Sequence, residues 1–515
     1  MQQFKPTNNE VDFLDTRYVL QYLLVFALVL LAGWIGKDLT VILIITIILF
    51  FCLSKNLFFA LNVWLIWFFT QGFYVGQNFI HNSLILNYFS KPSFILFIIF
   101  LFFFNTIPKT LFKKLFLISW LVFIFTALES SLYNDQMPFV LITISSFFFL
   151  YLLLTSTEIS RIQYQKILNL FVTVAILQTF VSLLQVLEIL PPATKLMSDG
   201  FGGIELWKAA LDDAASGTFG PDSSHLVSWY VSMIALFATL IWVMTRRLKY
   251  IVVVIISLAQ FATVDSKTVM AVMAVMILYL LFFLLKNRLS FSLTLPNFFK
   301  MISIAIGLAF SLLIAWNMYY EDTNSKYGNG QRGDLHSVYK NEVAGSFNAI
   351  TEHWTEWGKI QGFHYVFDDF LNNPIQIICG YGLQGYNYNG KMKYIESLDT
   401  PIMQSDDSTR SRSGLIALFA TTGIVGFALI FISLFDWYKF NLNWCKLNLK
   451  LQEDTSLILI TLSMVKIFSF FSLLLAFLYS FDLTSIPIIS FAGLVAVLKQ
   501  YSELTDTTPD EPNIT

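Results

Sequence analysis

The sequence predicts an all-α fold: a polytopic transmembrane helical bundle of about 14 spans, with one large external loop that contains helices. The first observation is composition, because 56% of the 515 residues are hydrophobic and only 13% are charged, whereas soluble domains are about 25% charged. The second is that apolar runs of about 20 residues, enough to cross a bilayer as a helix, recur along the chain. The third is that these runs are continuous rather than alternating, which is typical of membrane helices.

The spans are predicted from these apolar runs, taken in order along the chain. The second, the ninth and the last run give the weakest signals. The expected starts lie near Arg17, Leu39, Leu57, Phe94, Leu115, Met137, Lys166, His225, Tyr250, Lys267, Met301, Gly414, Ser456 and Ser485.

The orientation of the bundle is predicted from lysine and arginine in short loops, which concentrate on the cytoplasmic side of a membrane. With this span count the basic clusters fall in even-numbered loops, so both termini are expected in the cytoplasm and the odd-numbered loops outside. Lys37 and Lys91 are minor exceptions. The clusters are Lys55; Lys109, Lys113 and Lys114; Arg161 and Lys166; Arg246, Arg247 and Lys249; Lys286 and Arg288; and Lys439, Lys446 and Lys450.

The domain organisation follows from the spans and the two long external loops. We expect a cytoplasmic N-terminal segment at 1–16, transmembrane helices 1–11 at 17–319 with an external loop at 191–224, a large external or periplasmic loop at 320–413, transmembrane helices 12–14 at 414–499, and a disordered cytoplasmic tail at 500–515.

The large loop is the one block with the mixed composition of a soluble segment. Apolar residues from Trp357 to Leu371 recur at helical spacing, and Pro374 is expected to close that helix. The whole chain has a net charge of −2 and no basic domain, so nucleic acid is not a predicted partner. Its three cysteines have no metal-ligand spacing and no phosphate-binding loop is present, so neither a metal nor another cofactor is predicted.

Charged residues at the membrane boundary are functional candidates, because a charge in or beside a span is costly. Asp265 and Lys267 interrupt two apolar runs on the external side. A tight hairpin whose ions reach bulk water explains them equally well. His225 stands at the start of a span, where a polar helix-mouth residue is also ordinary.

Two stretches in the middle of the chain, GTFGPDSSHLVSWY from Gly217 and VDSKTVMAVMAV with Ser266 and Lys267, resemble motifs of the O-antigen ligase and O-antigen polymerase family of bacterial membrane glycosyltransferases. GTFGPDSSHLVSWY, from Gly217, resembles the family's "GTFGNPNHLA" at the start of a span and shares its GTFG and a following histidine, His225. VDSKTVMAVMAV resembles the family's "TxSRGAWLAL", with Ser266 kept and Lys267 where arginine is usual.

Two later stretches continue the resemblance in the same order. GKIQGFHYVFDDFLNNP resembles the external-loop pattern "GRxxxWxxAxxxxxxxP", with Lys359 in place of arginine and Phe363 in place of tryptophan, and a "GYGLQGY" follows like the family's "GxGxG" turn. SRSGLIALFATTGIVGF resembles "HNxxLxxLxxxGxxG", with Gly423 and Gly426 in register and Arg412 where histidine is common. The four motifs span residues 216–434. The missing histidine favours the polymerase over the ligase.

The resemblance implies a GT-C-like fold in the bacterial inner (plasma) membrane, whose enzyme transfers glycan from a polyprenyl diphosphate to a sugar hydroxyl with inversion and without a metal. Its partners would be the polyprenyl diphosphate-linked oligosaccharide, membrane lipids, and chain-length regulator and flippase proteins. Cationic side chains would neutralise the diphosphate leaving group, and a general base would activate the acceptor hydroxyl. The candidates are Lys267, Lys359, Arg410, Asp222 and His225 for the diphosphate, and His364, Asp406, Asp407 and Arg412 for catalysis.

Three alternatives remain open from the sequence. The chain could be a ligase, which differs from a polymerase only in using lipid A-core as the acceptor. It could be a flippase for lipid-linked oligosaccharides or another transporter, although the two related halves that are common in transporters are not visible. It could also be a structural membrane protein, in which case the order of the motifs is coincidence.

Overall fold

The structure is a computed structural model, and among the residues that it describes 91% are helical and none lies in a strand. The all-α prediction is therefore confirmed for these residues. They are 13–35, 37–74, 91–107, 149–155, 159–186, 189–190, 217–219, 224–245, 247–260, 374–380, 414–451, 457–467 and 486–505, with Ser146, Met273, Met276 and Leu371.

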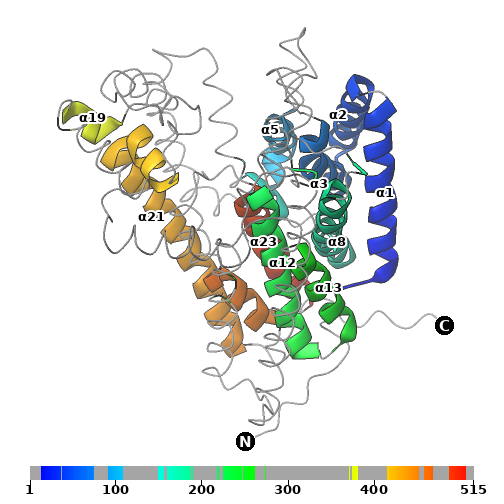
Figure 1. Ribbon diagram of the computed structural model, residues 1–515. Helices are drawn as coiled ribbons and strands as arrows, with labels where there is room; N and C mark the ends of the chain where they lie inside the picture. Colours follow the sequence, from blue (N-terminus) through cyan, green and yellow to red (C-terminus); the bar gives the residue numbers. More distant parts are fainter. Residues whose placement is uncertain are drawn as a thin grey trace, which may run out of the picture.

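Apart from η1 and α19, the described helices begin close to the predicted span starts (Figure 1), and α19 begins at Pro374, where we expected a helix to end. They are α1 (Thr16–Ile35), α2 (Lys37–Leu53), α3 (Leu57–Tyr74), α5 (Pro92–Phe103), the 3₁₀ turn η1 (Phe104–Thr106), α8 (Arg161–Val186), α12 (Ser224–Thr245), α13 (Leu248–Ala259), α19 (Pro374–Cys379), α21 (Gly414–Leu451) and α23 (Ile486–Thr505).

Four described helical segments are long and apolar enough to cross a membrane, and shorter apolar helices accompany them. The total of about 14 spans stays a prediction. The four segments are Thr16–Gly33, Arg161–Gln185, Leu226–Thr245 and Gly423–Leu449.

Local sequence signals explain where several helices begin. Ser160 and Gln163 form a capping box at the start of α8: the Ser160 N–H donates to Gln163 Oε1 (2.8 Å) and the Gln163 N–H donates to Ser160 Oγ (3.4 Å). This box starts the helix at Arg161, before the start near Lys166 that the apolar run predicts. In α5 the first turn contains Pro92, whose fixed backbone angle suits that position.

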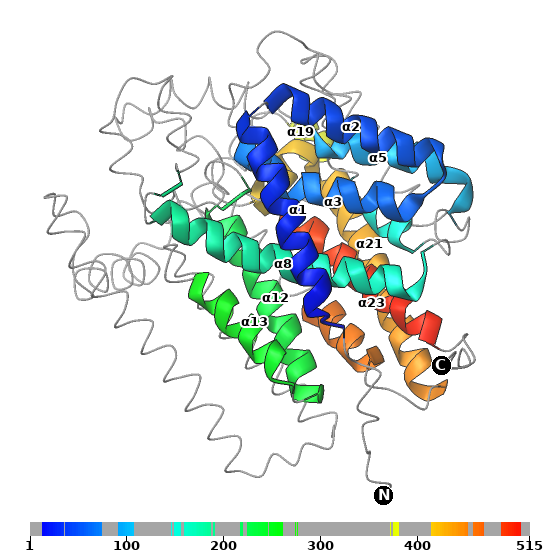
Figure 2. The same ribbon diagram turned by 90° about the vertical axis from the view of Figure 1, so that its right-hand side faces the viewer.

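The centre of the bundle is formed by α8 and α12, most of whose residues are buried, whereas α1 and α21 lie at its edges with few residues buried. α12 packs against α8, α13 and α23, and α8 also contacts α1. Figure 1 shows α1 and α21 on opposite sides of this group, and Figure 2 shows α1 crossing α8. α8 therefore carries the polar contacts described below from a largely buried position, beside α12 and the equally buried α23.

Buried aromatic side chains fill the core, and the hydroxyls of two buried tyrosines join separate segments by hydrogen bonds. The Tyr230 hydroxyl donates to the carbonyl oxygen of Phe171 (2.8 Å), and the Tyr151 hydroxyl donates to Asn441 Oδ1 (2.8 Å). Such partners are required because a buried hydroxyl without one is costly. The first bond joins α12 to α8, and the second joins the helical segment at 149–154 to α21.

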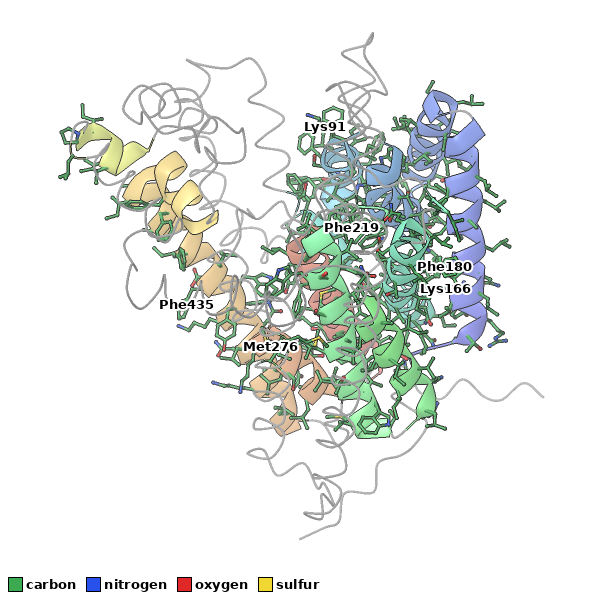
Figure 3. All side chains as sticks on the ribbon, viewed as in Figure 1. Lys91, Lys166, Phe180, Phe219, Met276 and Phe435 are labelled. Atoms are coloured by element: carbon green, nitrogen blue, oxygen red, sulfur yellow. The ribbon has the colours of Figure 1, made fainter. Side chains whose placement is uncertain are left out.

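The outer face of α1 is apolar and exposed. Four leucines spaced three or four residues apart are more than half exposed, which places them along one side of the helix: Leu20, Leu24, Leu28 and Leu31. Figure 3 shows a similar outward side chain, Phe435, on α21. Outward apolar side chains on both edge helices are typical of a surface that contacts lipid.

The last helix is longer than the sequence predicts. α23 runs to Thr505, so residues 500–505, which we assigned to the disordered tail, are helical. The physical reason is burial: the Tyr501 ring packs against Phe13 (centroids 4.9 Å apart) and under the guanidinium of Arg161 (4.9 Å). Ser502 is also buried. The rest of the predicted tail lies outside the described residues.

Candidate functional site

The described part of the candidate site is the turn at Gly217–Phe219, which precedes α12 in the first motif. Gly217 has a φ of +59°, a left-handed conformation that glycine adopts without strain. A Cβ atom there would lie 2.1 Å from Gln178 Oε1. Both the backbone angle and the close approach of α8 therefore require glycine at this position.

Gln178 on α8 binds the middle of the turn with its whole amide group. The Thr218 N–H donates to Gln178 Oε1 (2.8 Å), and Gln178 Nε2 donates to Thr218 Oγ1 (2.6 Å). The Thr218 hydroxyl donates in turn to the carbonyl oxygen of Phe69 (2.5 Å), near the end of α3. One threonine thus connects α3, α8 and the turn.

Gln185 binds the preceding residue in the same way. The Gly217 N–H donates to Gln185 Oε1 (2.9 Å), and Gln185 Nε2 donates to the Gly217 carbonyl oxygen (3.1 Å). Gln178 and Gln185 lie two helical turns apart on one face of α8, and both side chains are buried. Together they satisfy both backbone polar groups of Gly217 and the N–H of Thr218.

Phe219 anchors the turn in the aromatic core. Its ring stacks on Phe69 (centroids 6.1 Å apart) and meets Tyr230 edge-on (5.5 Å), and Phe69 and Tyr230 also contact each other (5.3 Å). Figure 3 places Phe219 at the upper end of α12. The rings of Phe69 on α3 and Tyr230 on α12 therefore hold Phe219, and with it the turn, against these two helices.

The same face of α8 also reaches the end of α13. Ser182 lies between the two glutamines, and its Oγ accepts a hydrogen bond from Gln260 Nε2 (3.1 Å). Gln260 directly follows the last residue of α13 and is buried. In the sequence, Gln260 precedes Asp265 and Lys267 of the second motif by a few residues.

Segments of the third and fourth motifs contact each other in the structure. α19 ends at Cys379, and Gly380 follows with a φ of +77°. Gly423 interrupts α21 with a φ of +60°, and a Cβ there would lie 2.4 Å from the Ile378 carbonyl oxygen and 2.5 Å from the Gly380 nitrogen. The two backbones approach so closely that only glycine fits at Gly423.

The predicted site residues lie almost entirely outside the described residues. His225 is the second residue of α12, so it follows the bound turn by a few residues, but only its backbone is described. The structure therefore does not test whether the site residues come together. Those outside the described residues are Asp222, Lys267, Lys359, His364, Asp406, Asp407, Arg410 and Arg412.

The sequence analysis did not single out Gln178, Ser182 and Gln185. A signal for them was present, since three polar residues at one-turn spacings on one face of an apolar helix are functional or packing candidates. Their partners, however, lie in other segments of the chain, so the contacts themselves have no local sequence signature. None of the three titrates, and their chemistry is to hold a backbone in place.

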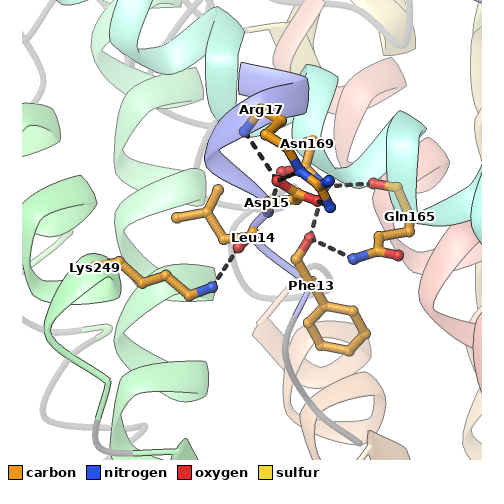
Figure 4. Close-up of polar contacts among 7 residues, drawn as sticks. All are labelled: Phe13, Leu14, Asp15, Arg17, Gln165, Asn169 and Lys249. Carbon is orange, nitrogen blue, oxygen red and sulfur yellow. Dashed lines mark hydrogen bonds and ion pairs between the residues drawn. The ribbon is translucent and has the colours of Figure 1, made fainter. Parts of the chain in front are cut away.

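A second polar cluster ties down the N-terminal latch, which we define as residues 13–15 (Figure 4). Asn169 Nδ2 donates to the Phe13 carbonyl oxygen (2.6 Å), while Asn169 Oδ1 accepts from the Asp15 N–H (2.9 Å). Lys249 Nζ donates to the carbonyl oxygen of Leu14. The latch thus contacts α8 and α13 through side chains.

Asp15 also caps α1. Its carboxylate accepts from the backbone N–H of Arg17 (2.9 Å) and from the Arg17 guanidinium (2.9 Å). The side-chain hydrogen bond from Arg17 lowers the pKa of Asp15 from its ordinary value of 3.8. This pair is a helix cap on the surface of the latch, since the Arg17 side chain is mostly exposed.

No group of histidine, cysteine, aspartate and glutamate residues able to hold a metal ion occurs within the described ranges. Comparison of the chain with models of protein families, with characterised proteins and with solved structures finds no match.

Proposed function

We propose that the chain is a GT-C-like membrane glycosyltransferase of the O-antigen polymerase type, which joins lipid-linked repeat units on the external face of a bacterial inner membrane. The observation that carries the proposal concerns glycine. Among the described residues, the glycines with positive φ are Gly217, Gly380 and Gly423, and each lies in one of the motifs that resemble this family. The motif positions thus coincide with backbone conformations that favour glycine.

The arrangement of helix ends supports an external location for the turn. The start of α8, the N-terminal latch and the end of α23 meet through Arg161, Phe13 and Tyr501, and Lys249 joins them. Basic residues gather at cytoplasmic ends of spans. Gln185 and the turn it binds lie at the other end of α8, which is the external end if the basic end is cytoplasmic.

The proposed reaction breaks the bond between the anomeric carbon of the donor and a diphosphate oxygen. The acceptor hydroxyl loses its proton to a carboxylate or histidine, with His364, Asp406 and Asp407 as candidates, and its oxygen bonds to the anomeric carbon with inversion. The electron pair leaves with the diphosphate. Cations stabilise the charge that develops there, and the candidates are Lys267, Lys359, Arg410 and Arg412.

The test is chain extension by the purified full-length protein. Mixed with polyprenyl diphosphate-linked repeat units, it should produce longer lipid-linked glycans. Lys267→Ala and Lys359→Ala should abolish extension, whereas Lys439→Ala, an exposed lysine of α21, should not. Movement of labelled lipid-linked sugar across vesicles with no change in chain length would identify a flippase and refute the proposal.

A deletion experiment in cells distinguishes the polymerase activity from the ligase activity. If the chain polymerises, its deletion removes long surface glycans and leaves a single repeat unit attached. If it is a ligase, deletion removes all attached surface glycan, and the polymerase proposal is then wrong in its acceptor.

A further inference from the structure

One face of α8 contacts two segments that are distant in sequence. Gln178 and Gln185 bind Gly217 and Thr218 before α12, and Ser182 binds Gln260 after α13. We call these three α8 residues the α8 clamp. Because they occupy one face of one helix, a rotation or shift of α8 moves both segments together.

We propose that the α8 clamp is a positioning device, which fixes the segment before α12 relative to the segment after α13. The inference rests on the proposed transferase function, because these segments lead to the donor-binding candidates His225 and Lys267. It adds residues that carry no charge, touch no candidate catalytic group among the described residues, and lie outside all four motifs.

The hydrogen-bond pattern favours positioning over simple packing. A glutamine that only fills space can be replaced by an apolar residue, but here each amide uses both its oxygen and its nitrogen on the turn. Paired bonds of this kind fix the orientation of Gly217 and Thr218 as well as their distance from α8. Both glutamines are buried, so breaking either pair of hydrogen bonds costs free energy, because no water molecule replaces the lost partner.

Positioning also has a chemical use in the proposed reaction. Charge develops on the diphosphate as its bond to the sugar breaks, and fixed donors and cations stabilise that charge best when they do not need to reorganise. A displacement of about 1 Å at such a site can cost about 100-fold in rate. Elements that carry different parts of one site therefore gain from a common rigid support.

The test uses the full-length protein with the double substitution Gln178→Met and Gln185→Met, which keeps side-chain length and removes all four hydrogen bonds to the turn. The matched control is Thr179→Val, on the same helix, whose hydroxyl donates within α8 to the Ala175 carbonyl oxygen (3.1 Å). Two measurements are made on folded protein: amide hydrogen exchange of residues 217–219, and kcat and KM for lipid-linked repeat units.

We expect faster exchange at 217–219 in the double variant and a fall in kcat of about 100-fold. KM for the donor should change by less than about threefold, because charge attraction to the diphosphate does not depend on fine geometry. A variant with normal kcat per folded molecule, or one in which kcat falls only in proportion to folded protein, would overturn the inference.

Ser182→Ala gives a milder version should the double variant fail to fold. It removes the one bond to Gln260, and we expect kcat to fall about tenfold with KM nearly unchanged; unchanged kcat overturns the role of Ser182 and with it the link between the two segments. Wild-type protein that extends no glycan refutes the proposed function. In that case amide hydrogen exchange alone tests the α8 clamp. Normal amide exchange at 217–219 in the double variant would refute the proposal that the clamp holds the turn.

Discussion

Replacing Gly217 with alanine should destabilise the protein more than the same replacement of Gly493, a glycine inside α23. An alanine at a φ of +59° costs about 1–2 kcal/mol. Its Cβ would also stand 2.1 Å from Gln178 Oε1, so the glutamine must move and lose two hydrogen bonds. At about 1 kcal/mol per bond the total is about 3–4 kcal/mol.

The assay is the free energy of unfolding of purified protein, measured by titrating a denaturing detergent against helical circular dichroism. Gly493→Ala is the matched control, because Gly493 lies inside α23 and the nearest atoms to a Cβ there belong to the side chains of Leu150 (3.1 Å), Phe171 (3.2 Å) and Leu154 (3.5 Å). Alanine in a helix interior gains about 1 kcal/mol over glycine. We therefore expect a loss in Gly493→Ala below about 1.5 kcal/mol.

The comparison between the two variants decides whether the clamp geometry is correct. If Gly217→Ala unfolds at the same detergent concentration as the wild type, or as Gly493→Ala, then the left-handed turn and its contact with Gln178 are wrong. A crystal or cryo-electron microscopy structure with Gln178 turned away from Thr218 would refute the same geometry directly.

Three further predictions concern other contacts. Gly423→Ala should separate α19 from α21, because the added Cβ would lie 2.4 Å from the rigid Ile378 carbonyl oxygen. Cysteine cross-linking between these two helices should therefore fall, and unchanged cross-linking would contradict the close approach. Tyr230→Phe should cost about 1 kcal/mol of unfolding free energy, because one buried hydrogen bond to α8 is lost. The pair between Asp15 and Arg17 lowers the pKa of Asp15, so its small contribution to stability should be complete at neutral pH and disappear as the pH falls below 3.8. A difference in stability between wild type and Asp15→Asn that persists at that low pH would be inconsistent with it.

The sequence could predict the helices because their signals are local. Apolar run length gave starts close to those of α1, α3 and α12, and the shift of the α8 start to Arg161 has a local cause in its capping box. The extension of α23 was not predictable in this way, since residues 500–505 are polar and are held in a helix by contacts with Phe13 and Arg161.

The candidate site likewise has a part that the sequence could predict and a part that depends on long-range contacts. The resemblance drew attention to Gly217 and Gly423, and both have backbone conformations and close contacts that require glycine. The contacts of Gln178 and Gln185 with the turn could not be predicted, because the sequence around a glutamine in an apolar run does not indicate which distant backbone it binds. The charged candidates, from Lys267 to Arg412, remain predictions because they lie outside the described residues.

The N-terminal latch has a consequence for how the protein is made. Phe13 packs on Tyr501, and the hydroxyl of Tyr250 accepts hydrogen bonds from the backbone of Phe13 and Leu14. Tyr501 lies near the other end of the chain, whereas Tyr250 lies near its middle. Since synthesis runs from the N-terminus, the latch can bind α8 and α13 early, but its contact with Tyr501 can form only after α23 has left the ribosome and inserted. A chain truncated before α23 would lack this last contact and leave one side of the Phe13 ring uncovered.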